Sequence, residues 1–196
     1  MEIEGLFSSG KWNLIELLAQ EELSPLQLSE KIGTSVANVS QQLKLLELVG
    51  LVQTRKLPNR ERGKPRTLYS IAQDNIMVIC ALKNFAKKHF FKAAPVVSAV
   101  SRILCFPQQE LHYPLLKLFW IIEPQLEGVS AIVYDTPSMT VLVATPKPSS
   151  LKFQGVYALK GVTFHVKVVS DFRAKPLKPG QYPIYDPEHS LVEAKQ

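Results

Sequence analysis

Apolar residues recur at helical spacing in three short segments near the start of the chain. The first segment predicts an amphipathic helix over residues 11–20. The second predicts a helix over residues 24–33, where a serine cap and a proline begin the helix and a glycine ends it. The third predicts a helix that is capped by Thr34 or Ser35 and stops at Gly50. Two helices joined by a glycine turn have the spacing of a helix-turn-helix.

The hydrophobic pattern then changes to an alternation of apolar and polar residues. Residues 51–55 and 67–71 alternate as two half-buried strands would, with the stretch 56–66 between them. Three helices followed by such a hairpin predict a winged helix.

The middle of the chain is broadly apolar from residue 73 to residue 92. We interpret this run as one long helix that packs on the winged helix with one face and on a second subunit with the other. A helix packed only within its own chain is the alternative. Pro95 ends this helix, a further apolar stretch covers residues 96–106, and residues 107–126 predict an amphipathic helix with a kink or start at Pro114.

Beyond residue 126 the pattern predicts strands over residues 129–134, 139–144 and 162–169. The proline-rich tail is expected to be irregular and partly wrapped on the surface. The predicted fold class is α+β, with an N-terminal winged helix-turn-helix, central helices for dimerisation and a small C-terminal α/β domain. The predicted domains are a winged-helix domain over residues 1–72, a helical dimerisation region over residues 73–106 and a C-terminal domain with its tail over residues 107–196.

Composition narrows the class of protein. With 46% hydrophobic residues, 20% charged residues and a net charge of +6, the chain is neither disordered nor collagen-like. Cys80 and Cys105 lie far apart in apolar stretches, so we expect neither a disulfide framework nor a thiolate metal cluster. The first residues are acidic where a signal peptide would be basic, and the apolar runs are short. We therefore expect a soluble cytoplasmic protein with no membrane contact.

Positive charge is concentrated over residues 55–66, from the last residue of the first predicted wing strand to the start of the second. Six cations stand there against the single acid Glu61, a local excess of five, and such a cluster favours binding to nucleic acid. Residues 63–66 add a thin glycine-proline tip that is able to follow a narrow minor groove. An ordinary solvated loop is the alternative. The six cations are Arg55, Lys56, Arg60, Arg62, Lys64 and Arg66.

The third predicted helix has one apolar and one polar face. Val39, Leu43 and Leu46 share the first face. The other face offers amides that can pair with adenine, a methyl group that fits thymine, and a lysine for a base or phosphate. Without a DNA partner, this would be an ordinary solvated helix face. Its members are Ala37, Asn38, Gln41 and Lys44.

Residues 10–71, and above all the helix and strand over residues 35–52, resemble ArsR-type winged-helix transcription regulators. The resemblance implies a homodimer that places two such helices in successive major grooves of double-stranded DNA. It implies base contacts from Ala37, Asn38 and Gln41, and phosphate contacts from Ser40 and Lys44. The helix cap Ser35 and the six wing cations complete the predicted DNA-binding set. The paired cysteines of the metal-sensing members are absent, so we do not expect soft-metal sensing through this helix.

The C-terminal half faintly resembles the small nucleotidyltransferase fold, whose activity needs a Gly-Ser turn and paired aspartates that hold magnesium. Ser138 and Thr140 stand where those carboxylates would fall, and no Gly-Ser precedes them. The four histidines are scattered, and no phosphate loop or nucleophile elbow appears. We therefore expect no enzyme activity, no cofactor and no metal site.

These observations give a hypothesis and an alternative. The hypothesis is a homodimeric, sequence-specific DNA-binding transcription regulator that represses by blocking its operator, with a C-terminal domain for assembly or for sensing an unknown small molecule. The alternative is a winged-helix adaptor that binds proteins and has no specific DNA affinity.

Overall fold

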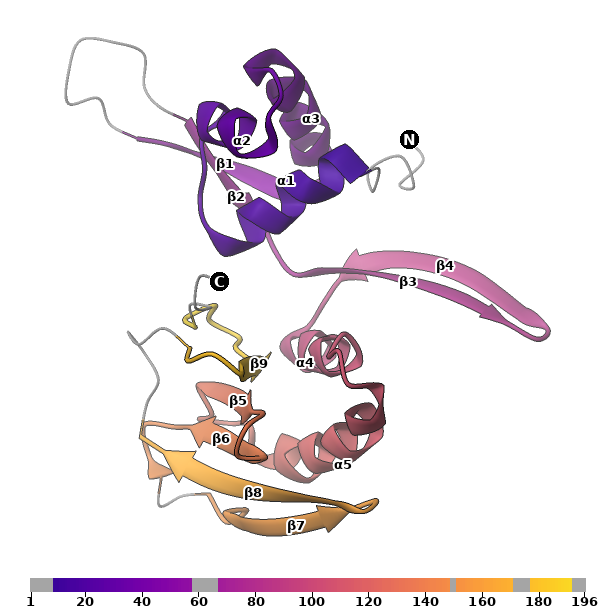
Figure 1. The fold of residues 1–196 in the computed structure, drawn as a ribbon, viewed down its shortest axis with the longest axis vertical. Helices are drawn as coiled ribbons and strands as arrows, with labels where there is room; N and C mark the ends of the chain where they lie inside the picture. The colour runs from indigo at the N-terminus through magenta and orange to yellow at the C-terminus, as the bar shows by residue number, and fades with distance from the viewer. Residues whose placement is uncertain (1–8, 58–66, 149–150, 171–176, 192–196) are drawn as a thin grey trace. The chain divides into compact units, whose positions relative to one another are not determined.

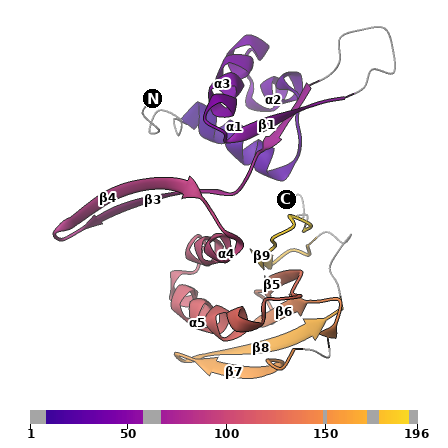
Figure 2. The same ribbon diagram turned by 180° about the vertical axis from the view of Figure 1, so that it is seen from behind.

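The computed structural model describes residues 9–57, 67–148, 151–170 and 177–191. The chain divides into two compact units, Met1–Asn75 and Ile76–Gln196. Their elements are labelled in Figure 1 and seen from behind in Figure 2. No helix among the described residues is both long enough and apolar enough to cross a membrane.

The described residues of the first unit form three helices and a strand hairpin, which Figure 1 labels. Strands β1 and β2 pair antiparallel, from Val52 opposite Ile71 to Lys56 opposite Thr67. Leu23 extends this small sheet through two backbone hydrogen bonds with Tyr69, of 3.1 and 2.8 Å. The winged helix-turn-helix predicted from the hydrophobic pattern is therefore confirmed. Its elements are α1 (Ser9–Gln20), α2 (Pro25–Ile32), α3 (Val36–Leu48), β1 (Val52–Lys56) and β2 (Thr67–Ile71).

Local capping explains why α2 and α3 begin and end where they do. The Ser24 hydroxyl accepts a hydrogen bond from the Gln27 amide, and the Gln27 side chain accepts one from the Ser24 amide, which forms a capping box. Gly33 ends α2 in the left-handed conformation, with φ of +74°. Of the two predicted caps for α3, Ser35 is the N-cap, and it accepts from the Asn38 amide at 3.2 Å.

Replacing Gly33 with alanine is expected to destabilise the first unit by about 1 kcal/mol. The space around Gly33 is open, so the cost comes from forcing an L side chain into the left-handed region. The matched control is Gly10→Ala in α1, where the added methyl group meets Gln42 at an ordinary contact of 3.9 Å. Urea unfolding should show lower stability for the first variant and unchanged or slightly higher stability for the control. Equal effects of the two changes would contradict the backbone explanation.

The long helix predicted over residues 73–92 is wrong. This segment forms strands β3 (Asn75–Leu82) and β4 (Phe85–Lys92), which make a two-stranded sheet of their own. A continuous apolar run does not distinguish helix from strand by its periodicity, and here the β-branched and aromatic residues favour the strand. Asn84 makes the tight turn between the strands with a left-handed φ of +64°. The central region therefore contains one helix, α4 (Pro95–Leu104), with Pro95 in its first turn.

The rest of the second unit has two helices against a five-stranded sheet. The strand order is β7-β8-β6-β5-β9, in which β6 and β8 are parallel and all other pairs are antiparallel. The predicted amphipathic helix is α5, with Pro114 in its first turn and a short 3₁₀ turn on either side. The elements are η2 (Gln109–Leu111), α5 (His112–Ile122), η3 (Glu123–Gln125), β5 (Ala131–Asp135), β6 (Thr140–Ala144), β7 (Gly155–Leu159), β8 (Val162–Val169) and β9 (Gln181–Tyr185).

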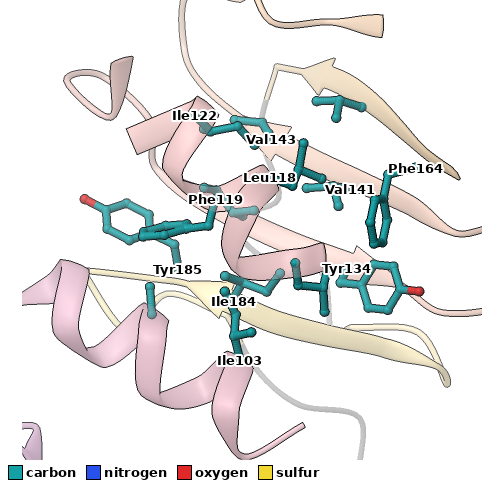
Figure 3. Packing of buried hydrophobic residues seen from close by; sticks show 14 of the residues in the cluster. Ile103, Leu118, Phe119, Ile122, Tyr134, Val141, Val143, Phe164, Ile184 and Tyr185 are labelled. Carbon is teal, nitrogen blue, oxygen red and sulfur yellow. The ribbon is translucent and has the colours of Figure 1, made fainter. Parts of the chain in front are cut away.

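The core of this unit lies between the helices and one face of the sheet. Figure 3 shows Leu118, Phe119 and Ile122 of α5 with side chains of the central strands. Aromatic rings fill the remaining space, and the rings of Tyr134 and Phe164 meet edge to face with centroids 6.0 Å apart. Successive residues of β5 and β6 are buried, so both faces of these strands are covered, and their β-branched and aromatic residues favour the strand in the sequence.

Part of the tail forms a strand where the sequence predicts irregular structure. Residues 181–185 form strand β9, which pairs antiparallel with β5 at the edge of the sheet. Pro183 is tolerated because an edge strand has one side on which its amide needs no partner, and a β-bulge lies beside it. Ile184 and Tyr185 are buried in the core, so this part of the tail belongs to the fold.

Candidate nucleic-acid interface

The outward face of α3 is open to solvent. Ala37, Asn38, Gln41 and Lys44 are all exposed, whereas Val39, Leu43 and Leu46 are buried against the rest of the first unit. The helical period places the two sets on opposite faces, so packing fixes the direction in which the exposed set points. A small methyl group, two amides and one ammonium group are thus presented together.

The two amides of this face differ in their hydrogen bonds. Asn38 donates from Nδ2 to Thr34 Oγ1 at 3.1 Å, and its Oδ1 accepts from Gln42 Nε2 at 2.9 Å. Gln41 makes no hydrogen bond with its side chain among the described residues. Gln41 is therefore ready to bind another molecule, whereas Asn38 would first have to exchange its helix-surface partners.

The two serines of the predicted set lie in different environments. Ser35 is exposed, and its hydroxyl already accepts the amide that caps α3. Ser40 is half-buried. Capping is thus a structural role for Ser35 that does not depend on DNA.

The described part of the wing presents two of the six cations. Arg55 and Lys56 are exposed on β1, and the Arg55 guanidinium donates to the Glu22 carboxylate. Hydrogen bonding to Glu22, together with its negative charge, raises the pKa of Arg55. An arginine is charged at any physiological pH, so the consequence is competition between Glu22 and a phosphate for the same donors. The other four predicted cations, Arg60, Arg62, Lys64 and Arg66, lie outside the described residues.

The end of α3 and the first wing strand are joined directly. Gly50 turns the chain with φ of +73°, and the Leu51 amide donates to the Leu46 carbonyl at 3.0 Å. Three residues further along the chain, in β1, Thr54 Oγ1 donates to Glu47 Oε1 at 3.2 Å. These contacts fix the start of the wing relative to the exposed helix.

Three partners of this surface were missed by the sequence prediction. Thr34 and Gln42 stand four residues either side of Asn38, and helical spacing could have identified them. Glu22 is 33 residues from Arg55, and no local pattern connects them. Folding brings these two together because Leu23, next to Glu22, pairs with Tyr69 of β2, and β2 pairs with β1.

The C-terminal positions examined for metal chemistry have structural roles. Thr140 is buried and donates to the Ser138 carbonyl at 3.1 Å, and the Ser138 hydroxyl donates to Asp135. In the described part of the chain, no three His, Cys, Asp or Glu side chains gather where they could hold a metal ion. Cys80 and Cys105 are both free.

Three helices, a glycine turn and a β wing define a winged helix-turn-helix, a class of domain that binds DNA with its second motif helix. Residues 8–54 match the family model described as "Bacterial regulatory protein, arsR family". The N-terminal unit is thus ArsR-like, which supports a DNA-binding transcription regulator. The C-terminal half lies outside this match.

Two solved structures are similar to parts of this chain. A homodimeric winged helix-turn-helix DNA-binding domain from Mycobacterium bovis, described as a possible ArsR-family transcriptional regulator, is 29% identical with a TM-score of 0.29. The match covers 35% of this chain and 58% of that domain. A ferric uptake regulator from Francisella tularensis, solved with iron, is 20% identical over 50% of this chain and 78% of its own, also with a TM-score of 0.29. The comparison with curated proteins gives no match.

Proposed function

We propose that this protein is a sequence-specific transcription repressor that binds its operator as a homodimer and blocks it sterically. The observation that carries the proposal is the outward face of α3 in a winged helix-turn-helix. There the Gln41 amide, which has no hydrogen-bond partner among the described residues, lies one turn from Lys44. In this class of domain, that helix enters the major groove.

The residues divide into two roles. Gln41 and Ala37 are assigned to base edges, because a free amide can pair with adenine and a methyl group can contact thymine. Lys44, Lys56 and Arg55 are assigned to phosphates, together with the four cations outside the described residues. Asn38 is assigned to adenine as well, and to make this contact it must break its hydrogen bonds with Thr34 and Gln42.

The C-terminal unit is assigned to assembly or to the sensing of a small-molecule effector. Its five-stranded sheet and two helices form a closed core of their own, so it can act as a separate body in the regulator.

The test begins with selection of binding sites from random DNA by the purified protein. Gln41→Ala should then weaken the selected site by about 1–3 kcal/mol for each adenine contact and leave random DNA nearly unaffected. Lys44→Ala should weaken both by the same factor and lower the slope of log affinity against log salt by about 1 for each subunit. Gln20→Ala, which removes an exposed amide at the end of α1, is the control and should change neither.

Two results would contradict the proposal. Uniform loss with both α3 variants at fixed salt would mean that Gln41 does not read bases. Failure of the wild-type protein to select any sequence, with negligible DNA retention at moderate salt, would favour the protein-protein adaptor.

A further inference from the structure

The β3-β4 hairpin is a large structural element without a core. None of its sixteen strand residues is buried. Ile79 and Leu82 on β3 are 65% and 67% exposed, and Phe85 at the start of β4 is 50% exposed. A two-stranded hairpin alone is marginally stable in water, and one that exposes large apolar side chains needs a partner.

The two edges of this hairpin differ in charge. Strand β4 carries Lys87, Lys88 and Lys92, whereas β3 carries no charged residue over its whole length. Lysine on an edge strand is a common means of preventing the addition of another strand. Only the β3 edge is therefore free of this protection.

We propose that β3 pairs antiparallel with β3 of a second copy of this chain, so that two hairpins form one four-stranded sheet around a two-fold axis. The inference deepens the proposed function, because it assigns the surface on which the proposed homodimer assembles.

A second copy fits this edge for a geometric reason. In an antiparallel pair, alternate residues of each strand direct their N–H and C=O groups toward the neighbour, so two eight-residue strands can form about eight hydrogen bonds. With a two-fold axis, the same strand from each of two copies forms the two sides of this hydrogen-bond ladder. The assembly is therefore complete with two subunits.

The charges favour the same pairing. In the order β4-β3-β3-β4, the two lysine-bearing strands lie at opposite edges, about 14 Å apart at three strand spacings. That separation exceeds the screening length of about 8 Å at physiological ionic strength. Pairing through β4 would instead bring six lysines together across the axis, where like charges are destabilising.

The pairing also provides contacts for the apolar side chains on both faces of β3. Ile76, Val78 and Leu82 alternate with Met77 and Ile79 along the strand, so each face of the four-stranded sheet would carry apolar groups from two chains. Cross-strand contacts among β-branched side chains stabilise a sheet by a few tenths to 1 kcal/mol for each pair.

The first experiment measures assembly without DNA. The full-length protein and two variants are examined by sedimentation equilibrium across micromolar concentrations. Ile79→Lys places a charge on the β3 edge, and the control Ala86→Lys places the same charge on an exposed position of β4. We expect Ile79→Lys to raise the dimer dissociation constant at least tenfold and Ala86→Lys to change it less than threefold. Circular dichroism checks that both variants fold.

The second experiment locates the axis by disulfide formation. In a Cys80→Ser, Cys105→Ser background, single cysteines are placed at each position from 76 to 82 and, as controls, at Ala86 and Trp120. Residues that face their own copy across an antiparallel pair have Cα atoms about 4.5–5.5 Å apart, which a disulfide can span. We expect cross-linking to peak at one or two adjacent positions on β3 and to be weak at both controls.

Each outcome of the two experiments supports or overturns the β3 pairing. A monomeric wild-type protein at tens of micromolar, equal effects of the two lysine variants, or cross-linking that peaks at Ala86 or Trp120 would overturn the β3 pairing. None of these results bears on base reading by Gln41, which is measured separately on selected DNA. Loss of base reading with intact β3 cross-linking would in turn reject the DNA role and retain the dimer.

Discussion

Replacing the four cations that lie between Lys56 and Thr67 with alanine is expected to remove most of the salt dependence of DNA binding. Each phosphate contact contributes about 0.9 to the slope of log affinity against log salt, because it releases counterions from the duplex. A dimer loses eight cations in this variant, so the slope should fall by up to about 7. The four residues are Arg60, Arg62, Lys64 and Arg66.

The control variant removes four positive charges from the second unit and leaves the wing unchanged. Lys152, Lys160, Lys167 and Lys178 are exposed in the second unit, and their replacement by alanine lowers the net charge equally. Filter binding on one duplex over a series of salt concentrations should show a slope change below about 1 for this control. A similar decrease in both variants would mean that total charge, and not the wing, attracts the DNA.

The second large effect is expected in the packing of α3. Leu43→Ala should lower the free energy of unfolding of the first unit by about 2–5 kcal/mol, because Leu43 is fully buried beneath the outward face and the change leaves a cavity. Leu48→Ala is the matched control, with the same chemical change in the same helix at a side chain that is 79% exposed. It should change stability by less than about 0.5 kcal/mol.

Urea unfolding followed by the fluorescence of Trp12, in a Trp120→Phe background, reports on the first unit alone. Trp12 lies in α1, whereas Trp120 lies in α5 of the second unit. DNA affinity at low urea should follow the folded fraction of each variant. A stable Leu43→Ala protein with weakened DNA binding would contradict the role of Leu43 as a packing residue.

The N-terminal fold is predictable because its signals are local. The capping box at Ser24, the left-handed Gly33 and the cap at Ser35 each act within a few residues, and the helical period then separates buried from exposed positions. The same period identifies the outward face of α3. It does not identify the ion pair of Arg55 with Glu22, which depends on the pairing of Leu23 with Tyr69 and of β2 with β1.

The second unit is less predictable because its signals conflict. The run that forms β3 is apolar at every position after Asn75, so neither a period of 2 nor one of 3.6 stands out. Strand β7 was missed, although Lys160 and Gly161 both have positive φ and make the turn into β8. Strand β9 was missed because prolines surround it, and proline excludes a central strand but not an edge strand.

The position of β9 has a consequence for synthesis of the protein. The winged helix is complete once residue 75 has emerged from the ribosome, whereas β5 receives its second neighbour, after β6, only when residues 181–185 follow. About 50 residues separate the end of β5 from the end of β9, roughly 2–10 seconds of translation at common rates. During that interval the edge of β5 is unpaired and can join strands of other nascent chains. Slowed translation late in the message should therefore favour aggregation of the second unit while the first is already folded.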